Sequence, residues 1–541
     1  MGLGKMNKNE SNDLGGGSPS GLLRSRSGYC PENVALEFLG TTFTYKRFDA
    51  EVSAVAAGLL GLGLTPGDAA SIFMSNRPEY LFTWFGINRA GMVTVFANTA
   101  YKGTFLGYGI EHSESKIIFT EAKLLPEVLA LAPPPPGLRF IVCLDELPPE
   151  LPHGQGARVM SLQELVSAAA ADTQFPQVLP AHSGTISFTS GTTGKSKGAV
   201  TPNMLNVVFG KEAAQAFGLT TRDRLYTCMP LFHGMAQMTS VIASIYVGAT
   251  LVISPAFSVR RFWDEIRESR ATEFNLVGSM LYMLLSAPPG PRDREHSVTR
   301  AFAAPAPADV LYRFEARFGL QLIEGYGQTE IKNVLYNPVN ARKVGSMGKP
   351  TASTILEVHD DNGDQVAPGV TGEIVYRPRL ANIMLKEYYR DPDATLANMR
   401  GLWWHTGDLG YVDGDGFFYF IGRKKDSLRR RGENVSSHEL ESVAAQFAGL
   451  GEVAAVAMRS DVGEDEIMIV FECDKPADFD FQALFKHCVV SMPRYMVPRY
   501  YRNVAALPRT ANGKVRKVEL REAGITPDTW DHVAAGLVVP R

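Results

Sequence analysis

Short apolar runs alternate with amphipathic helical segments in the first part of the chain. Apolar residues in 42–64 recur at the roughly 3.6-residue period of a helix. Residues 69–74 are an apolar run suited to a buried strand, 78–90 are helical again, and 92–96 are a second strand-like run. Strands that are separated by helices usually pair in parallel, because each helix carries the chain back across the sheet. The pattern predicts an α/β fold.

The sequence pattern changes twice further along the chain. Near Val344 the apolar runs become short and are separated by Asp/Gly turns, which is typical of a β-rich region. After Lys425, two helical segments accompany two strand-like runs, which predicts a small α+β domain. The predicted organisation is a flexible tail over 1–30, an N-terminal domain over 31–424 with a β-rich subdomain over 344–424, and a C-terminal domain over 425–541.

Composition excludes several classes of protein. In 541 residues, 54 basic and 57 acidic side chains give a net charge of −3, so no global field attracts the chain to nucleic acid or to an anionic membrane. Five cysteines without C-x-x-C spacing indicate reduced thiols in the cytoplasm, not a disulfide scaffold or a structural zinc site. The longest uncharged stretch, 225–259, is interrupted by prolines and glycines, so no membrane span is expected.

The most informative segment is 185–200, TISFTSGTTGKSKGAV. A β-like run opens into a loop in which glycines let backbone N–H groups converge on an anion, while hydroxyls and ammonium groups add donors and charge. The P-loop of ATPases does not fit, because its leading glycine would fall at Thr189. The segment therefore predicts a polyphosphate site formed by Thr189, Ser190, Gly191, Thr192, Thr193, Gly194, Lys195 and Lys197.

The loop T-S-G-T-T-G-K-S-K-G resembles the phosphate loop of the adenylate-forming superfamily, which contains acyl- and aryl-CoA synthetases, nonribosomal adenylation domains and beetle luciferases. Ser196 stands where that superfamily usually has proline. Four more segments are similar to its motifs and occur in its order: EGYGQTE (324–330), WHTGDLG (404–410), IGRKKDSLRRRGENVSSHE (421–439) and LPRTANGKVRK (507–517). A weaker resemblance extends back to residue 42.

The resemblance implies a reaction in two steps. A carboxylate first attacks the α-phosphorus of ATP, giving an acyl-adenylate and pyrophosphate, and the thiol of coenzyme A then displaces AMP. Lys514 is expected to bridge the carboxylate and the α-phosphate, Thr329 to contact that phosphate, and Glu330 with Thr193 to hold Mg²⁺. Besides the phosphate loop, the residues expected to bind ATP and AMP are Gly325, Tyr326, Gly327, Gln328, Asp408 and Arg423.

The same resemblance assigns a moving C-terminal domain. Lys425 matches the hinge about which that domain rotates between the two steps, so that one cleft receives two sets of side chains in turn. Residues of the basic run and the glycine after it are expected to bind coenzyme A: Arg430, Arg431, Gly432 and Glu433.

The acid itself is less defined by the sequence. His233, which also counts among the catalytic candidates, is expected to line the acyl pocket with Gln237 and Lys332. Lysine two residues after Glu330 favours a small polar or charged acid, and R-R-R-G-E-N-V-S resembles the carnitine/crotonobetaine-CoA ligase branch. A stand-alone adenylation enzyme that loads a carrier protein is the alternative, and a homodimer is left open. A catalytically inactive binding protein is disfavoured because the motif residues are all present.

Overall fold

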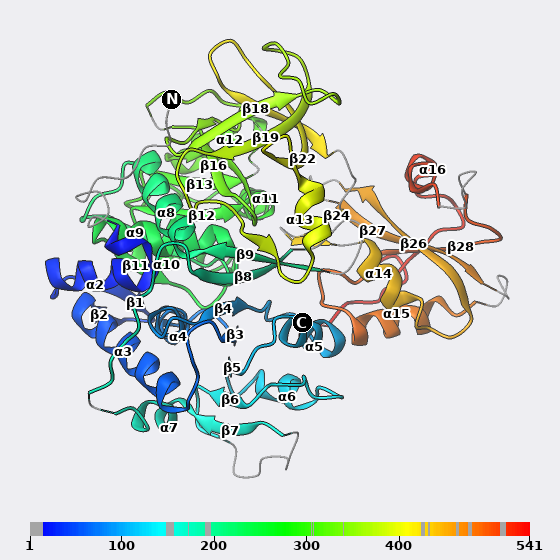
Figure 1. Cartoon of the computed structure of the whole chain (residues 1–541). Helices are drawn as coiled ribbons and strands as arrows, with labels where there is room; N and C mark the ends of the chain where they lie inside the picture. Colours follow the sequence, from blue (N-terminus) through cyan, green and yellow to red (C-terminus); the bar gives the residue numbers. More distant parts are fainter. Residues whose placement is uncertain are drawn as a thin grey trace. The chain divides into compact units, whose positions relative to one another are not determined.

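Figure 1 shows the computed structural model of the chain. It describes residues 14–147, 156–170, 172–189, 196–304, 306, 308–338, 340–423, 428–430, 433–435, 437–460, 465–473, 479–508 and 515–540. The chain divides into two compact units. The first consists of Met1–Thr99, Gly107–Phe188 and Gly198–Lys424, and the second of Ala100–Leu106, Thr189–Lys197 and Lys425–Arg541.

Two large sheets, built mostly from parallel strands, form the first unit, as the alternating pattern predicts. One runs in the order β20 (Glu387–Tyr388), β9 (Lys197–Pro202), β8 (Ser183–Thr189), β4 (Val93–Phe96), β3 (Ala69–Phe73), β5 (Ile117–Thr120), β6 (Phe140–Cys143) and β7 (Arg158–Ser161). The other runs β14 (Gln321–Ile323), β13 (Arg300–Ala304), β12 (Glu273–Val277), β10 (Arg224–Thr227), β11 (Thr250–Ile253), β1 (Val34–Phe38) and β2 (Thr41–Thr44).

Two smaller antiparallel sheets complete the strands of this unit. The hairpin β15 (Gly325–Gln328) and β16 (Lys332–Tyr336) pairs with β17 (Lys349–Pro350). The other sheet, in the predicted β-rich region, contains β18 (Thr354–His359), β19 (Gly372–Pro378), β22 (Trp403–Val412), β21 (Met399–Arg400) and β23 (Phe418–Arg423).

Helices connect these strands. Their bounds are η1 (Gly15–Gly17), α2 (Pro19–Tyr29), α3 (Tyr45–Gly61), α4 (Pro78–Arg89), α5 (Gly103–His112), α6 (Leu125–Leu129), α7 (Leu162–Ser167), α8 (Asn203–Phe217), η2 (Ala236–Ile242), α9 (Ala243–Val247), α10 (Phe262–Glu268), α11 (Gly278–Ser286), α12 (Ala308–Phe318) and α13 (Pro392–Asn398). The helix predicted over 42–64 begins later, because residues 41–44 pair as strand β2 with β1.

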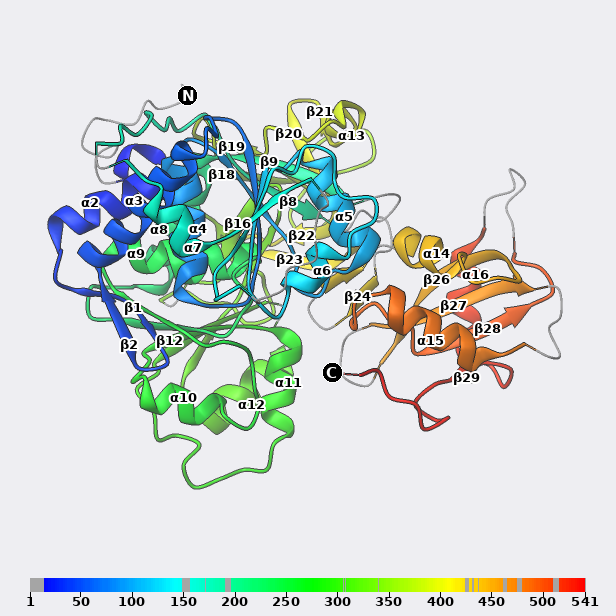
Figure 2. The ribbon, with the colours of Figure 1, turned by 90° about the horizontal axis from the view of Figure 1, so that it is seen from below.

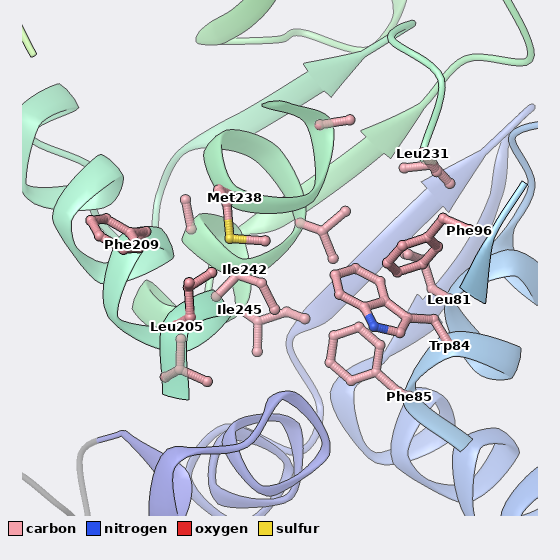
Figure 3. Close-up of a cluster of buried hydrophobic side chains, with 14 of the residues drawn as sticks. Leu81, Trp84, Phe85, Phe96, Leu205, Phe209, Leu231, Met238, Ile242 and Ile245 are labelled. Carbon is pink, nitrogen blue, oxygen red and sulfur yellow. The ribbon is translucent and has the colours of Figure 1, made fainter. Parts of the chain in front are cut away.

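The core of the first unit brings α4 together with α8, η2 and α9 (Figure 3). Trp84 on α4 is fully buried, and its ring centroid lies 5.4 Å from that of Phe96. The π-helix η2 packs against α8 so closely that a Cβ at Gly210 would lie 2.3 Å from a methyl carbon of Ile242. Glycine at that position is therefore required for η2 to reach its place.

The predicted flexible tail is wrong for residues 19–29, which form α2. Ser18 accepts a hydrogen bond from the backbone N–H of Gly21 and Pro19 occupies the first turn, both of which favour a helix start. Leu22 and Leu23 are fully buried. The serine-rich composition concealed this short apolar pair.

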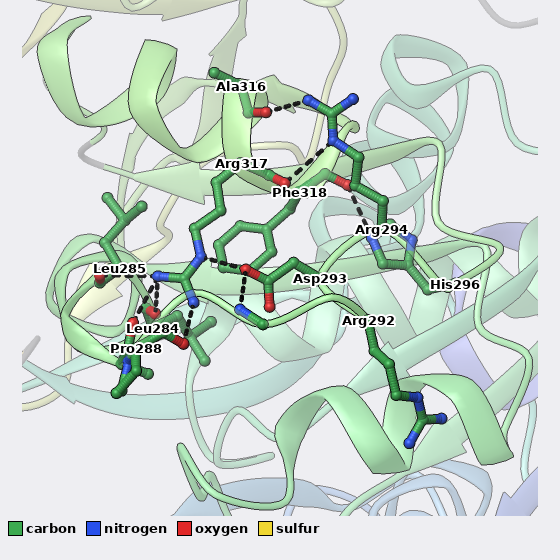
Figure 4. Close-up of polar contacts among 12 residues, drawn as sticks. Leu284, Leu285, Pro288, Arg292, Asp293, Arg294, His296, Ala316, Arg317 and Phe318 are labelled. Carbon is green, nitrogen blue, oxygen red and sulfur yellow. Dashed lines mark hydrogen bonds and ion pairs between the residues drawn. The ribbon is translucent and has the colours of Figure 1, made fainter.

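The half-buried Arg317 fixes a segment of the first unit. At the end of α12, Arg317 donates to Asp293 at 2.7 Å and to the carbonyl oxygens of Leu285, Ala287 and Pro288 at 3.0, 2.7 and 2.9 Å (Figure 4). Charge-assisted bonds of this kind are stronger than neutral ones. One side chain thereby fixes the irregular segment between α11 and β13.

The second unit is the predicted α+β arrangement, drawn in orange and red in Figure 2. Its main sheet contains β26 (Leu450–Arg459), β27 (Asp465–Cys473), β28 (Tyr500–Val504) and β29 (Trp530–Asp531), beside a short ladder of β24 (Leu428–Arg430) and β25 (Glu433–Val435). Its helices are α14 (Ser437–Ala444), α15 (Phe481–Ser491) and α16 (Lys517–Ala523). No helix in the described ranges of either unit combines the length and apolarity that a membrane crossing needs.

Glu273, at the start of β12, is a buried carboxyl group that lacks a hydrogen-bond partner among the described residues. It is 1% exposed, and neither carboxylate oxygen has a hydrogen-bond partner in the described part of the chain. Burial raises the pKa of Glu273 well above its ordinary value, although Arg300 acts in the opposite direction. The Arg300 guanidinium is already hydrogen-bonded to Asp223 at 2.9 Å, so it compensates Glu273 only in part.

We expect Glu273→Gln to stabilise the protein increasingly as the pH rises. Below about pH 4 the carboxyl group is protonated in both folded and unfolded states. At higher pH the unfolded state releases the proton first, so wild-type stability falls by about 1.4 kcal/mol per pH unit until the folded pKa is reached. The thermal midpoints of wild type and variant between pH 4 and 8 test this, with exposed Glu295→Gln as control. A difference that is independent of pH would contradict the expectation.

Candidate active site

The hairpin β15–β16 carries most of the motif residues. Gln328 pairs with Lys332, so Thr329, Glu330 and Ile331 form a three-residue loop. Loops of this length are commonly closed by a residue in the left-handed conformation, and Lys332 has φ +55°. A Cβ at Gly327 would lie 2.0 Å from the carbonyl oxygen of Lys332, so glycine is needed there. The local geometry thus places Thr329 and Glu330 at the tip.

Asp408 joins this hairpin to β22. The Tyr326 hydroxyl donates to its Oδ2 at 2.6 Å, and the amide of Gln328 donates to the same oxygen at 2.7 Å. Gln328 also donates to the carbonyl of Thr406 at 2.8 Å. Asp408 is 2% exposed. The structure therefore brings Tyr326, Gln328 and Asp408, three residues expected to bind the nucleotide, into direct contact.

The turn before Asp408 fixes the direction of its side chain. Gly407 has φ +72°, and its N–H donates to Glu373 at 3.1 Å. The Thr406 hydroxyl donates to the Ile374 carbonyl at 2.6 Å and accepts from the Asp408 N–H. In the ladder of β22 and β23, Arg423 pairs directly with Asp408. The backbone thus places Asp408 and Arg423, both predicted to bind the nucleotide, at one register position.

Glu330 is buried at the hairpin tip and is held from two sides. The Tyr388 hydroxyl donates to its Oε1 at 2.6 Å, and the Leu385 N–H donates to its backbone carbonyl at 2.9 Å. Burial, followed by the charge of Glu330, keeps the pKa of Tyr388 above its ordinary value, so the phenol remains a donor. Tyr388 was not anticipated from the sequence, because it lies outside the motif.

Lys332 lies against the segment that carries His233. Its Nζ would be 3.6 Å from a Cβ on Gly234, and the residue is 4% exposed. Burial lowers the pKa of Lys332 to about 8, while Glu330 acts in the opposite direction. Two of the three predicted pocket positions, Lys332 and the segment of His233, are therefore adjacent.

The segment of His233 follows the carboxyl end of β10 and is held by Asn76. The Asn76 amide donates to the carbonyls of Met229 at 2.9 Å and Ser254 at 3.1 Å, and its oxygen accepts from the Leu231 N–H at 2.9 Å. Sequence reasoning missed Asn76. Its position shortly after β3, a parallel strand, was the available signal, because ligand sites cluster at such strand ends.

Gln237, on the π-helix η2, has a different role from the one predicted. Its amide nitrogen donates to the Leu231 carbonyl at 3.0 Å, and the residue is 1% exposed. This donor supports the His233 segment instead of being presented to an acid. Asn275 holds the same helix through Thr239 and Ser240, at 2.9 and 2.5 Å. Irregular π-turns often occur at functional sites.

The ends of the phosphate loop are described, and its centre is not. The Ser196 hydroxyl donates to the Thr189 carbonyl at 2.7 Å, and the Thr189 hydroxyl donates to the Lys197 carbonyl at 3.4 Å. Serine at the position where the resembling family usually has proline therefore closes the base of the loop. Ser190, Gly191, Thr192, Thr193, Gly194 and Lys195 lie outside the described residues.

In the second unit, Arg430 does not fit the expected contact with coenzyme A phosphates. Its side chain is buried, pairs with Glu466 at 2.6 Å, and donates to the Val497 carbonyl. The guanidinium is thus committed to the interior of this unit. Glu433 is half-buried in β25. Lys514, Lys425, Arg431 and Gly432 lie outside the described residues, as does the side chain of Arg423.

Comparison with known proteins gives concordant matches. Crotonobetaine/carnitine–CoA ligase from Salmonella choleraesuis is 29% identical over 484 residues, which cover 88% of this chain and 93% of the relative. A double mutant of o-succinylbenzoate CoA synthetase from Bacillus subtilis, with a bound product analogue, has a TM-score of 0.79 at 25% identity, covering 93% and 98% of the two chains. A Mycobacterium tuberculosis fatty acyl CoA synthetase has a TM-score of 0.67 at 27% identity, covering 95% and 99%.

A family model described as AMP-binding enzyme matches residues 23–389. That range includes the phosphate loop, the His233 segment and the hairpin that carries Tyr326 and Glu330. Because it spans more than half of the sequence, the chain belongs to the AMP-binding enzyme family.

Proposed function

We propose that this protein is an AMP-forming acid–CoA ligase. It activates a carboxylic acid with ATP to an acyl-adenylate, releases pyrophosphate, and transfers the acyl group to the thiol of coenzyme A. The observation that carries the proposal is the hairpin that holds Thr329 and Glu330 at its tip while Tyr326 and Gln328 contact Asp408. The three relatives described above are named as coenzyme A ligases or synthetases, which supports this acceptor.

The nucleotide binds along the hairpin and β22. The Asp408 carboxylate accepts hydrogen bonds from the ribose hydroxyls, and Arg423 approaches from the opposite position of the ladder. The ring of Tyr326 stacks on adenine, while its hydroxyl keeps Asp408 oriented. Thr329 contacts the α-phosphate and the loop from Thr189 to Lys197 encloses the other phosphates.

Glu330 fits a ligand of Mg²⁺. Its carboxylate is anchored through one oxygen to the Tyr388 hydroxyl, and carboxylate oxygens together with phosphate oxygens are the donors that this ion prefers. Thr193 is the second expected ligand. When bound, the ion would neutralise negative charge on the phosphates. Glu330 and Thr193 would hold the ion in place.

Both steps develop negative charge on phosphate or acyl oxygens, so positioning and cations contribute more than a general base. Lys514 supplies the cation during adenylation. Rotation about Lys425 then replaces it by the face that contains Arg431, Gly432 and Glu433, which contacts coenzyme A. His233 stands between the acid and the thiol.

The acid is small and polar or charged. The name of the Salmonella relative specifies crotonobetaine and carnitine, which carry a quaternary ammonium group, and that of the Bacillus protein specifies o-succinylbenzoate, which carries two carboxylates. The buried ammonium of Lys332 beside Gly234 would repel a cationic acid. The reaction takes place in the cytoplasm, in accord with five free thiols.

A panel of carboxylic acids tests the proposal. Pyrophosphate release that depends on ATP and on an acid is expected, and thioester is expected with coenzyme A alone. Thioester that forms only on a phosphopantetheinylated carrier protein would instead support the alternative, a stand-alone adenylation enzyme. A clear preference for long fatty acids would contradict the proposed acid class.

We expect Lys514→Ala to impair the first step selectively. Removing a preorganised cation raises the barrier of adenylation by about 3–4 kcal/mol, which is roughly a 10²–10³-fold loss of rate. Thioester formation from a supplied acyl-adenylate should be retained, since Lys514 has left the site by then. Arg516→Ala, which removes an exposed cation paired with Glu519, is the control. An equal loss in both steps would contradict the assigned role.

We expect Tyr326→Phe to raise the KM for ATP about tenfold, because it removes one charge-assisted hydrogen bond to Asp408 but keeps the stacking ring. Steady-state kinetics with ATP as the varied substrate measure this. Tyr419→Phe removes a comparable bond to Asp413 outside the site and is the matched control. Equal effects of the two substitutions would exclude a specific role for Tyr326.

A further inference from the structure

Lys332 occupies a backbone position that other residues would fill at lower cost. The three-residue loop of the hairpin needs a left-handed residue, and Lys332 supplies it with φ +55°. For a residue other than glycine, asparagine or aspartate, that conformation costs about 1–2 kcal/mol. Glycine would meet the backbone requirement without this cost. The geometry of the hairpin alone therefore does not explain why lysine occupies this position.

The ammonium group is also placed where an ion is costly. Lys332 as a whole is 4% exposed, and among the described residues its ammonium group has no hydrogen bond or ion pair to a carboxylate or carbonyl. Glu330, in the loop two residues before Lys332, already accepts a hydrogen bond from the Tyr388 hydroxyl. An ammonium group that is largely removed from water and has no acceptor in the protein is unfavourable, so a negatively charged ligand group would stabilise it.

The position of Lys332 indicates which ligand. Its Nζ and Cδ would lie 3.6 and 3.8 Å from a Cβ on Gly234, the residue that follows His233. Gly234 has no side chain to cover the ammonium. The segment of His233 is held rigidly by Asn76 and Gln237. Cation and segment together form one wall, on the side where the acid is proposed to bind.

We propose that Lys332 determines substrate specificity by binding a second negatively charged group on the acid, so that the preferred substrate is a short dicarboxylic acid. The inference rests on the proposed function, because it assigns the acid of that same site. One carboxylate reacts with ATP, and the other receives a charge-assisted hydrogen bond from the Lys332 ammonium.

Two other roles make different predictions. If Lys332 only balances the charge of Glu330, its loss should affect all acids equally. If it binds a phosphate of ATP, its loss should raise the KM for ATP with every acid. Only a contact with the acid makes the effect depend on the second charge.

The experiment compares each dicarboxylic acid of three to six carbons with its monomethyl ester, measuring pyrophosphate release by the full-length enzyme. Wild type should prefer the diacid. Lys332→Gly, which keeps the left-handed backbone and removes the charge, should lower kcat/KM for diacids about 10–100-fold. It should leave the esters within about twofold, with the KM for ATP unchanged. Lys332→Met separates loss of charge from loss of side-chain volume, and exposed Lys123→Met is the control for net charge.

An equal loss for diacids and esters, or a wild type that activates acids without preferring diacids, would overturn the inference. A wild type that releases no pyrophosphate with any acid would refute the proposed function instead. Calorimetric titration of the diacids onto wild type and Lys332→Gly then decides the inference separately. Weaker binding to the variant supports it, and equal binding overturns it.

Discussion

The carboxylate of Asp408 is the contact on which the arrangement of the first unit's site depends. It receives Tyr326 and Gln328 from one sheet while its own strand belongs to another, so two independently built sheets share one anion. The hairpin end that carries Glu330 is fixed separately, through Tyr388. Short polar contacts thus connect parts of the site that belong to different sheets.

Much of this arrangement could be predicted from the sequence. The alternation of strands and helices specified the parallel sheets, and the motif around Tyr326 and Asp408 specified residues that contact one another. What could not be predicted depends on contacts distant in sequence. Asn76 supports the His233 segment from 153 residues away, and the pairing of Arg430 with Glu466 is invisible in a run of three arginines. Gln237 was predicted to line the acyl pocket because it lies close to His233 in the sequence. In the structure it belongs to the π-helix η2, and its side chain points to the Leu231 carbonyl.

Three arginines that are buried or half-buried differ from Lys332 in the partners that the fold provides for their charge. Arg89, Arg317 and Arg430 each reach carboxylates or carbonyl groups that the fold itself provides. Such groups stabilise the chain whether or not a ligand is present. No described residue offers Lys332 a comparable carboxylate or carbonyl partner, and its backbone has the left-handed conformation that is unfavourable for lysine. Contacts within the fold therefore account for the arginines, whereas the proposed contact with the acid accounts for the lysine.

The N-terminal helix α2 has a consequence for how the chain can be shortened. Ser20 donates its N–H and hydroxyl to Asn88 at 3.1 and 2.7 Å, and its carbonyl accepts from Arg89 at 3.2 Å. Asn88 in turn donates to Asn203 at 2.6 Å. A chain cut at residue 30, where composition alone places the edge of the domain, would lose two buried leucines, leave the surface they cover open to water, and break this polar network. The segment whose glycine- and serine-rich composition predicts a flexible tail is thus a structural part of the first unit.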